Sequence, residues 1–478
     1  MEDWSFPPAY DEAYRPPPDS RYWFPVRETM HPSDREKAIL TRLQEVCAYA
    51  FDNSAFYRRK WDAAGFHPSL LKSLEDFESR VPVITKAELR AAQAAVPPFG
   101  DYLCVPENEI FHIHGTSGTT GRPTAFAIGR DDWRAISNAH ARIMWGMGVR
   151  PGDTVCVAAI FSLYVGSWGA LAGAERLGSK AFPFGAGAAG MSARCAQWLD
   201  ILKPSAFYGT PTYALHLAQT ALDNGLDPRG FGLRTMFFSG EPGASIPAVR
   251  AKIEETYGAK AIDCGSMGEM TPWMNVSGSA ETDGMLCWQD VVYTEVCDPA
   301  RFRRVPYGRR GTPVYTHLER TSQPMIRLVS GDLTLWVNEP NPCGRTYPRL
   351  PMGIIGRIDD MFTVRGENVY PSEIDAVLNK TEGYGGEHRI VITRDGAMDE
   401  LAVKVEAVPE IWRAGEARVA AFRHGVAASL QKLLGLRAVV EIVAQHSLER
   451  TDFKARRVID DREALTEMRR RLSESSSS

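Results

Sequence analysis

The chain is 478 residues long and carries 55 basic and 59 acidic residues, a formal net charge of −4. This balance gives no electrostatic reason to expect nucleic acid or an anionic membrane as the main partner. Hydrophobic residues make up 44% and charged residues 24%, values typical of a globular protein too long for one core. We therefore expect a large domain and a smaller one, with neither nucleic acid nor membrane as a partner.

Further features bear on the cellular compartment. No apolar run approaches the ~20 residues of a membrane span, and the acidic, proline-bearing start MEDWSFPPAY is unlike a secretory signal. The eight cysteines are scattered without a CxxC pair, so we expect reduced thiols rather than a disulfide framework or a spacing-defined zinc site. These features predict a cytoplasmic protein.

The N-terminal region is predicted to be an extended arm followed by helices. The first ~35 residues are rich in Pro, Tyr and charge, which is typical of a segment that runs over a surface. Apolar residues at helical spacing predict a helix over about 34–57. Thr85 is a plausible N-cap for a helix over 86–95.

Residues 113–124, IHGTSGTTGRPT, form a polar loop between two apolar, strand-like segments, 110–113 and 124–128. Glycines and small hydroxyl-bearing residues bury little apolar area, but they can turn sharply and place N–H groups and hydroxyls against anionic oxygens. Arg122 adds a fixed positive charge. The spacings of the Walker A loop and of the GxGxxG fingerprint are absent. The strand–loop–strand frame favours a nucleotide phosphate loop over a flexible linker.

The remainder of the large domain alternates strands with helices. Strand-like segments at 154–160, 180–184, 206–209 and 233–238 are separated by helical patterns, which predicts a parallel sheet with crossover connections. After about Glu269 the segments become short strands with turns, which favours an antiparallel or barrel-like subdomain.

The chain from about residue 361 reads as a compact α+β unit with helices over 371–378 and 411–434. The predicted fold class is α/β, with an N-terminal domain over 1–357 and a C-terminal domain over 358–472. Residues 473–478 form a serine-rich tail that has nothing to bury and should be disordered.

The polar loop resembles the phosphate loop of adenylate-forming enzymes, the superfamily of acyl-CoA synthetases, carrier-protein adenylation domains and luciferases. The segments RVPVITKAELR, at 80–90, and PPFG, at 97–100, are similar to phenylacetate–CoA ligase and its relatives. In that family the position of Arg122 is usually Lys. The resemblance implies ATP, Mg²⁺ and coenzyme A as cofactors, and a catalytic role for Thr116. It also implies nucleotide binding by Ser117, Gly118, Thr119, Thr120, Gly121 and Arg122.

The segment DCGSMGE, which runs from Asp263 to Glu269, matches the superfamily motif that ends in a magnesium-binding glutamate. The resemblance therefore implies a catalytic, metal-binding role for Glu269 and places Asp263 in the nucleotide site. The motif departs from the family at two positions: Gly265 replaces the aromatic residue that packs on adenine, and Gly268 replaces a Ser or Thr.

Three further motifs match nucleotide contacts of the superfamily. The segment Ser239, Gly240, Glu241, Pro242 follows a strand at its carboxyl end, where nucleotides sit in open α/β sheets, and resembles the adenine-contacting segment. Asp332 matches the aspartate that binds the ribose hydroxyls, since two acceptor oxygens suit a vicinal diol. Arg357 matches a second ribose or phosphate contact.

The resemblance also implies a mobile C-terminal domain. Asp359 matches the hinge about which that domain rotates, a form of conformational gating that separates two half-reactions. Lys454, within RTDFKARRV at 450–458, aligns with the lysine that bridges substrate carboxylate and phosphate during adenylation.

The acyl pocket of the family corresponds to the segment AIFSLYVGSWG at 159–169. Its aromatic residues predict a slot suited to a flat ring rather than a long alkyl chain. The segment departs from the glycine-rich version of phenylacetate–CoA ligase, so phenylacetate itself is not assumed. The predicted pocket residues are Phe161, Tyr164, Trp168, Tyr208, Gly209 and Met267.

The sequence thus predicts a ligase that activates an aryl or arylacetic acid to an acyl-adenylate and transfers the acyl group to coenzyme A. One alternative is transfer to a carrier-protein phosphopantetheine or a non-thiol acceptor. Another is a non-catalytic nucleotide sensor, which Gly265 and Gly268 favour and which Lys454, Asp332 and Glu269 oppose. Family members are often dimers, so a homodimer is a further expectation.

Overall fold

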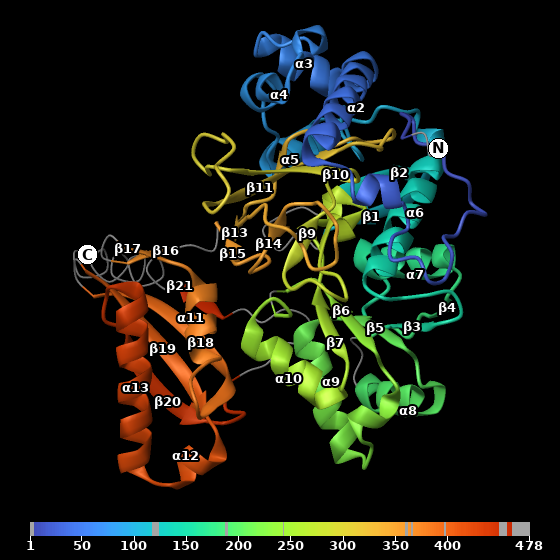
Figure 1. Ribbon diagram of the computed structural model, residues 1–478. Coiled ribbons are helices and arrows are strands. Elements are labelled where there is room, and N and C mark those ends of the chain that lie inside the picture. Colours follow the sequence, from blue (N-terminus) through green and yellow to red (C-terminus); the bar gives the residue numbers. More distant parts are fainter. Residues whose placement is uncertain are drawn as a thin grey trace. The chain divides into compact units, whose positions relative to one another are not determined.

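The computed structural model describes residues 4–116, 124–186, 190–241, 243–358, 362–364, 367–395, 398–448 and 457–460. The chain divides into two compact units, residues 1–354 and 355–478 (Figure 1). No helix among the described residues is long and apolar enough to cross a membrane. The functional boundary at 357/358 remains a prediction.

The first unit contains helices and strands in α/β alternation, as expected. Its helices are α1 (Pro25–Glu28), α2 (Pro32–Asn53), α3 (Ala55–Ala63), α4 (Leu74–Arg80), α5 (Lys86–Ala95), α6 (Arg130–Gly146), α7 (Val165–Leu177), α8 (Met191–Leu202), α9 (Pro211–Asp223) and α10 (Pro247–Tyr257). Its strands are β1 (Ile110–Gly115), β2 (Ala125–Gly129), β3 (Thr154–Val157), β4 (Lys180–Phe182), β5 (Ala206–Gly209), β6 (Thr235–Phe238), β7 (Lys260–Asp263), β8 (Val276–Ser277), β9 (Met285–Cys287), β10 (Val292–Cys297), β11 (Arg310–His317), β12 (Leu328–Val329), β13 (Asp332–Leu335) and β14 (Arg349–Leu350).

A five-stranded parallel sheet of order β4-β3-β5-β6-β7 organises this unit. Side chains alternate between its two faces, as the period of two in a strand requires. Val157, Tyr208 and Phe237 belong to the core that includes α6 and α7, whereas Phe207 and Phe238 belong to the core that includes α8, α9 and α10. The sheet is thus buried on both faces, which confirms the predicted crossover architecture (Figure 1).

The other strands of the first unit pair in antiparallel fashion. β1 pairs with β2, so the strand–loop–strand frame of the predicted phosphate loop is confirmed as a hairpin. β11 pairs with β10, β12 and β13, and β9 pairs with β8 and β14. These are the short strands that the sequence predicts after about Glu269.

The N-terminal helices differ from the prediction at one point. The helix predicted over about 34–57 is two helices, because Ser54 adopts an extended backbone between them and its side chain accepts a hydrogen bond from Tyr57 N. The Thr85 cap is confirmed: Thr85 and Glu88 form a capping box at the start of α5.

The second unit is an α+β unit, as predicted. A four-stranded sheet of order β20-β19-β18-β21 forms one core with its helices. Its elements are β15 (Gly356–Arg357), β16 (Phe362–Val364), β17 (Glu367–Val369), α11 (Pro371–Leu378), β18 (Tyr384–Asp395), β19 (Met398–Ala407), α12 (Pro409–Arg413), α13 (Glu416–Leu434), β20 (Val439–Ala444) and β21 (Val458–Asp460).

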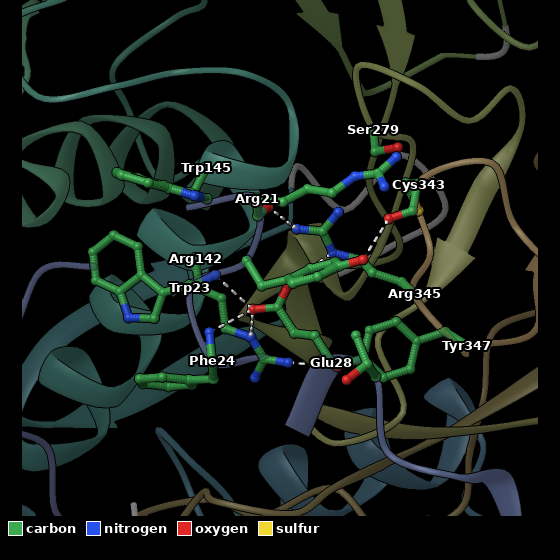
Figure 2. Close-up of polar contacts among 12 residues, drawn as sticks. Arg21, Trp23, Phe24, Glu28, Arg142, Trp145, Ser279, Cys343, Arg345 and Tyr347 are labelled. Carbon is green, nitrogen blue, oxygen red and sulfur yellow. Dashed lines mark hydrogen bonds and ion pairs between the residues drawn. The ribbon is translucent and has the colours of Figure 1, made fainter. Parts of the chain in front are cut away.

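A buried carboxylate fixes the N-terminal arm to the first unit. Glu28 is fully buried and accepts hydrogen bonds from Arg142 Nε at 3.1 Å and from Arg345 Nε at 2.8 Å. It also accepts from the backbone N–H groups of Trp23 and Phe24 (Figure 2). Each oxygen therefore has a charged partner, which is what a buried carboxylate requires.

Replacing Glu28 by Gln should destabilise the first unit. Gln keeps the volume but removes the carboxylate that pairs with Arg345 and one of the two that pair with Arg142, so we expect the free energy of unfolding to fall by about 3–5 kcal/mol. Urea denaturation measures this loss. As a control, Glu281→Gln removes the exposed ion pair with Arg21 and should have a much smaller effect. Equal losses in the two variants would contradict the role given to Glu28.

Candidate functional site

The candidate site lies at the carboxyl ends of β5, β6 and β7. The strands pair in parallel with Gly209 opposite Phe238 and Phe238 opposite Asp263, so their ends meet at one edge of the sheet. Ser239 follows β6 directly, and Gly265 is the second residue after β7. Such an edge is where ligands bind in open α/β sheets.

Three hydroxyl groups meet at this edge. Tyr208 OH lies 2.6 Å from Ser239 Oγ, and Tyr164 OH lies 3.1 Å from both. Burial raises the pKa of both tyrosines, so the hydroxyls keep their protons. A serine hydroxyl has one donor and two acceptor positions, so Ser239 can make a further hydrogen bond. We call Tyr164, Tyr208 and Ser239 the hydroxyl triangle.

Gly265 and Trp273 border the hydroxyl triangle. Gly265 has a φ of +123°, and a Cβ there would lie 3.1 Å from Ser239 Cβ and 3.6 Å from the Trp273 ring. The backbone favours glycine at this position, and the crowding leaves little room for a side chain. The Trp273 ring lies instead 5.3 Å from the ring of Tyr208.

Glu269 lies in a single 3₁₀ turn, Gly268–Met270, and is 4% exposed. Its Oε1 lies 3.5 Å from Lys86 Nζ, and its Oε2 has no hydrogen-bond partner among the residues that the structure describes. A buried carboxylate oxygen without a partner is costly, so it marks a position that a bound cation would satisfy.

Lys86 is a residue that the sequence interpretation missed. The Thr85 cap places it at the first position of α5, but no local pattern shows that Glu269 lies beside it. Its ammonium is the one charged partner of the Glu269 carboxylate within the described part of the chain.

Asp263 ends β7 and is 9% exposed. Burial raises the pKa of this carboxyl to about 6, although hydrogen bonds from Ser245 lower it. Its Oδ2 accepts from Ser245 N at 3.1 Å, so the side chain joins β7 to the segment before α10.

Three other predicted site residues, two nucleotide contacts and the catalytic candidate Thr116, are found as follows. Glu241 Oε1 accepts from Thr212 N at 2.7 Å, in the first turn of α9. Asp332 is buried at the start of β13, where its N–H donates to Ser330 Oγ at 3.0 Å. Thr116 N donates to Thr124 O at 3.1 Å and so closes the base of the β1–β2 loop.

Of the remaining predicted residues, Gly240 and Arg357 are described by the structure and the others are not. Gly240 is exposed, with a φ of +90°, beside the hydroxyl triangle. Arg357 lies on β15 in the second unit. The following lie outside the described residues: Ser117, Gly118, Thr119, Thr120, Gly121, Arg122, Pro242, Asp359 and Lys454.

The predicted acyl-pocket residues fall into two groups. Phe161 and Trp168 line an apolar cavity of about 560 Å³, together with Leu171, Phe184 and Met191. Tyr164 and Tyr208 are not among its lining residues and belong to the hydroxyl triangle. Gly209 ends β5 next to Tyr208, and Met267, 7% exposed, lies in the segment that leads to Glu269.

Comparison with known proteins places the chain in a family. Residues 366–462 match the family model of the AMP-binding enzyme C-terminal domain. A phenylacetate–coenzyme A ligase of Thermus thermophilus is 31% identical over 451 residues, which cover 91% of this chain and 98% of that protein. One of Escherichia coli is 33% identical over 430 residues, 89% of this chain and 95% of that protein.

The chain belongs to the phenylacetate–CoA ligase-like family of adenylate-forming enzymes. Among solved structures, a crystal structure of 2-hydroxyisobutyryl-CoA ligase in the postadenylation state, in complex with 2-HIB-AMP, is 69% identical. It superimposes with a TM-score of 0.93 and covers 99% of both chains. As a member of this family, the protein is an AMP-forming acid–CoA ligase that uses ATP and coenzyme A.

The residues of this ligase fit the Mg²⁺ that such enzymes use. Mg²⁺ takes oxygen ligands and is often held by one or two carboxylates plus the phosphates of the substrate. The unpartnered Oε2 of buried Glu269 is such a donor. When bound there, Mg²⁺ would neutralise part of the negative charge of the ATP phosphates.

The raised pKa of Asp263 predicts how the stability of the ligase depends on pH. Between about pH 4 and pH 6 the folded state keeps a proton that the unfolded chain releases, so this group's contribution to stability falls as pH rises. Asp263→Asn removes that dependence. The free energy of unfolding of the variant, relative to the natural protein, should therefore rise by on the order of 2 kcal/mol across this window.

Urea denaturation at pH 4, 5, 6 and 7 measures the difference between the two proteins. Asp283→Asn is the control: Lys260 holds the pKa of Asp283 below its ordinary value of 3.8, so the contribution of this group changes below about pH 4 and its difference should stay nearly constant from pH 4 to 7. A difference for Asp263→Asn that stays constant with pH would contradict the buried, protonated carboxyl.

Proposed function

We propose that the protein converts a short branched 2-hydroxy acid, 2-hydroxyisobutyrate or a close relative, into its coenzyme A thioester. The carboxylate of the acid attacks the α-phosphorus of ATP, which gives the acyl-adenylate and pyrophosphate. The thiol of coenzyme A then attacks the acyl carbon, loses its proton and displaces AMP.

The observation that carries this proposal is the hydroxyl triangle. An aryl group would require an apolar surface, whereas Tyr164, Tyr208 and Ser239 present three oxygens to one point at the ligand-binding edge of the sheet. A site built to hydrogen-bond a substrate hydroxyl strongly rejects an analogue without it, because the buried polar groups are then left unpaired. The triangle therefore suits the 2-hydroxyl of a small acid.

Sequence similarity supports the same acid. The solved 2-hydroxyisobutyryl-CoA ligase is 69% identical to this chain, compared with 31% and 33% for the two phenylacetate–coenzyme A ligases. Crystals of that protein also contain 2-HIB-AMP and CoA in a thioesterification state. This agrees with coenzyme A, rather than a carrier protein, as the acceptor proposed here.

An aromatic acid is the second candidate, and the apolar cavity favours it. Phe161 and Trp168 contact each other edge-to-face, with ring centroids 5.3 Å apart, at a cavity large enough for a phenyl ring. If this cavity holds the acyl group, the substrate is an aryl or arylacetic acid, as the sequence alone suggested.

The two candidates are separated by thioester formation with ATP, Mg²⁺ and coenzyme A. The acids to compare are 2-hydroxyisobutyrate, isobutyrate and phenylacetate. We expect kcat/KM to be at least about a hundredfold higher for 2-hydroxyisobutyrate than for isobutyrate. Preference for phenylacetate would favour the aromatic candidate. Pyrophosphate release without any thioester would instead point to another acceptor.

Tyr164→Phe should weaken the discrimination. Phe keeps the ring but removes one hydroxyl of the triangle, so the preference for 2-hydroxyisobutyrate over isobutyrate should fall on the order of tenfold. Trp168→Phe is the control, since Trp168 lines only the apolar cavity, and it should leave this ratio unchanged. A changed ratio in the control and an unchanged one in Tyr164→Phe would contradict the role of the hydroxyls.

The division into half-reactions is a further part of the proposal. In this proposal, one domain comprises residues 1–357 and a mobile domain comprises residues 358–472, with the hinge at Asp359. Lys454 is the cation that joins the carboxylate to the α-phosphate. Lys454→Ala should abolish pyrophosphate release, because two anions must meet. It should have little effect on thioester formation from preformed adenylate. Equal loss of both half-reactions would contradict this assignment.

A further inference from the structure

The segment between β11 and β12, residues 318–327, connects two parts of the candidate site. Arg320 within it is 4% exposed. Its NH2 donates to Ala127 O at 2.7 Å, and its NH1 donates to Thr271 O at 3.1 Å. One guanidinium group thus contacts two separate backbone segments.

Each of these segments leads to a proposed ATP contact. Ala127 lies on β2, the strand that follows the predicted phosphate loop. Thr271 follows the turn that carries Glu269, and its Oγ1 donates to Gly268 O at 2.8 Å, which closes the turn. Arg320 therefore spans the phosphate-loop hairpin and the metal-carboxylate turn.

Two buried neighbours hold Arg320 and the turn in place. Asp132 Oδ2 lies 3.3 Å from Arg320 Nε, and the same carboxylate accepts from the N–H groups of Thr321 and Ser322. His317 Nδ1 accepts from Met325 N at 2.9 Å, so its Nε2 carries the proton and donates to Thr271 O at 3.2 Å.

We propose that Arg320 is a positioning residue for Mg·ATP, because it fixes strand β2, which follows the predicted phosphate loop, relative to the turn that carries Glu269. This inference rests on the proposed roles of that loop and of Glu269. The planar guanidinium donates in two directions at once from a fixed geometry. A displacement of β2 relative to the turn that carries Glu269 would change the distance between the two groups proposed to bind the ATP phosphates.

Arg320→Lys tests this geometry. A lysine keeps the positive charge beside Asp132, but its single nitrogen on a flexible stem cannot hold Ala127 O and Thr271 O together. The matched control is Arg345→Lys, which alters another buried guanidinium, one that pairs with Glu28, the carboxylate that fixes the N-terminal arm.

The readout is the Kd of ATP, measured by titration calorimetry at low and high Mg²⁺ without acid or coenzyme A, together with the KM values. We expect Arg320→Lys to raise the Kd and KM for Mg·ATP on the order of tenfold and to leave the KM for the acid within about twofold. Arg345→Lys should lower the melting temperature without changing either constant. Identical profiles for the two variants would overturn the inference.

Three further variants keep the test decisive. Glu269→Gln shows whether the metal role holds: if it leaves the Mg²⁺ dependence of ATP binding unchanged, the proposed site fails. If Glu269→Gln changes the Mg²⁺ dependence of ATP binding but Arg320→Lys leaves the Kd of ATP unchanged, only the positioning role of Arg320 is contradicted. Should Arg320→Lys not fold, His317→Phe removes one donor to Thr271 O and should raise the Kd. His317→Gln, whose amide can donate and accept in the same places, should restore it; equal Kd values in the two His317 variants would overturn the inference.

Discussion

Buried ion pairs join segments of the first unit that its β-sheets do not connect. Glu28 and Asp290 accept from three buried arginines, Arg27, Arg142 and Arg345. Burial alone would raise the pKa of Asp290, but Arg142 and Arg27 hold it below its ordinary value. Removing one member leaves an uncompensated charge, so the network permits one arrangement of the arm, α6 and the 345–347 segment. The same helix α6 carries Asp132, which pairs with Arg320. Helix α6 thus carries two buried ion pairs, one with Glu28 of the N-terminal arm and one with Arg320 of the 318–327 segment.

Glu28 and Glu269 show how a structural carboxylate differs from one available to a ligand. Both are almost completely buried. Glu28 has two arginines and two backbone N–H groups, so its hydrogen-bonding capacity is used within the chain. Glu269 has one lysine at 3.5 Å, and its Oε2 has no partner in the described part of the molecule. Since an unpaired buried oxygen is unfavourable, the difference between the two environments is the physical reason for assigning a cation to Glu269.

The sequence predicted the parts of the fold that depend on local patterns. Alternation of strands and helices indicated the parallel sheet, and Thr85 with Glu88 indicated the start of α5. The long-range pairs left no such pattern: Glu28 lies 114 residues from Arg142 and 317 from Arg345. Arg320 and Lys86 were missed for the same reason, since their partners are distant in the chain. The motif that contains Ser239 was expected at the carboxyl end of a strand, and Ser239 directly follows β6, whose end shares one edge of the sheet with β5 and β7.

The acyl pocket shows a second limit of prediction from residue type. Aromatic residues in the 159–169 segment favoured a flat ring, because Tyr and Trp carry large apolar faces. Tyrosine also has a polar end, and only the structure shows which end reaches the site. Tyr164 presents its hydroxyl to Tyr208 and Ser239, whereas Phe161 and Trp168 face the separate apolar cavity. Polar and apolar surfaces thus lie side by side within one segment, and the part that receives the acyl group decides the substrate.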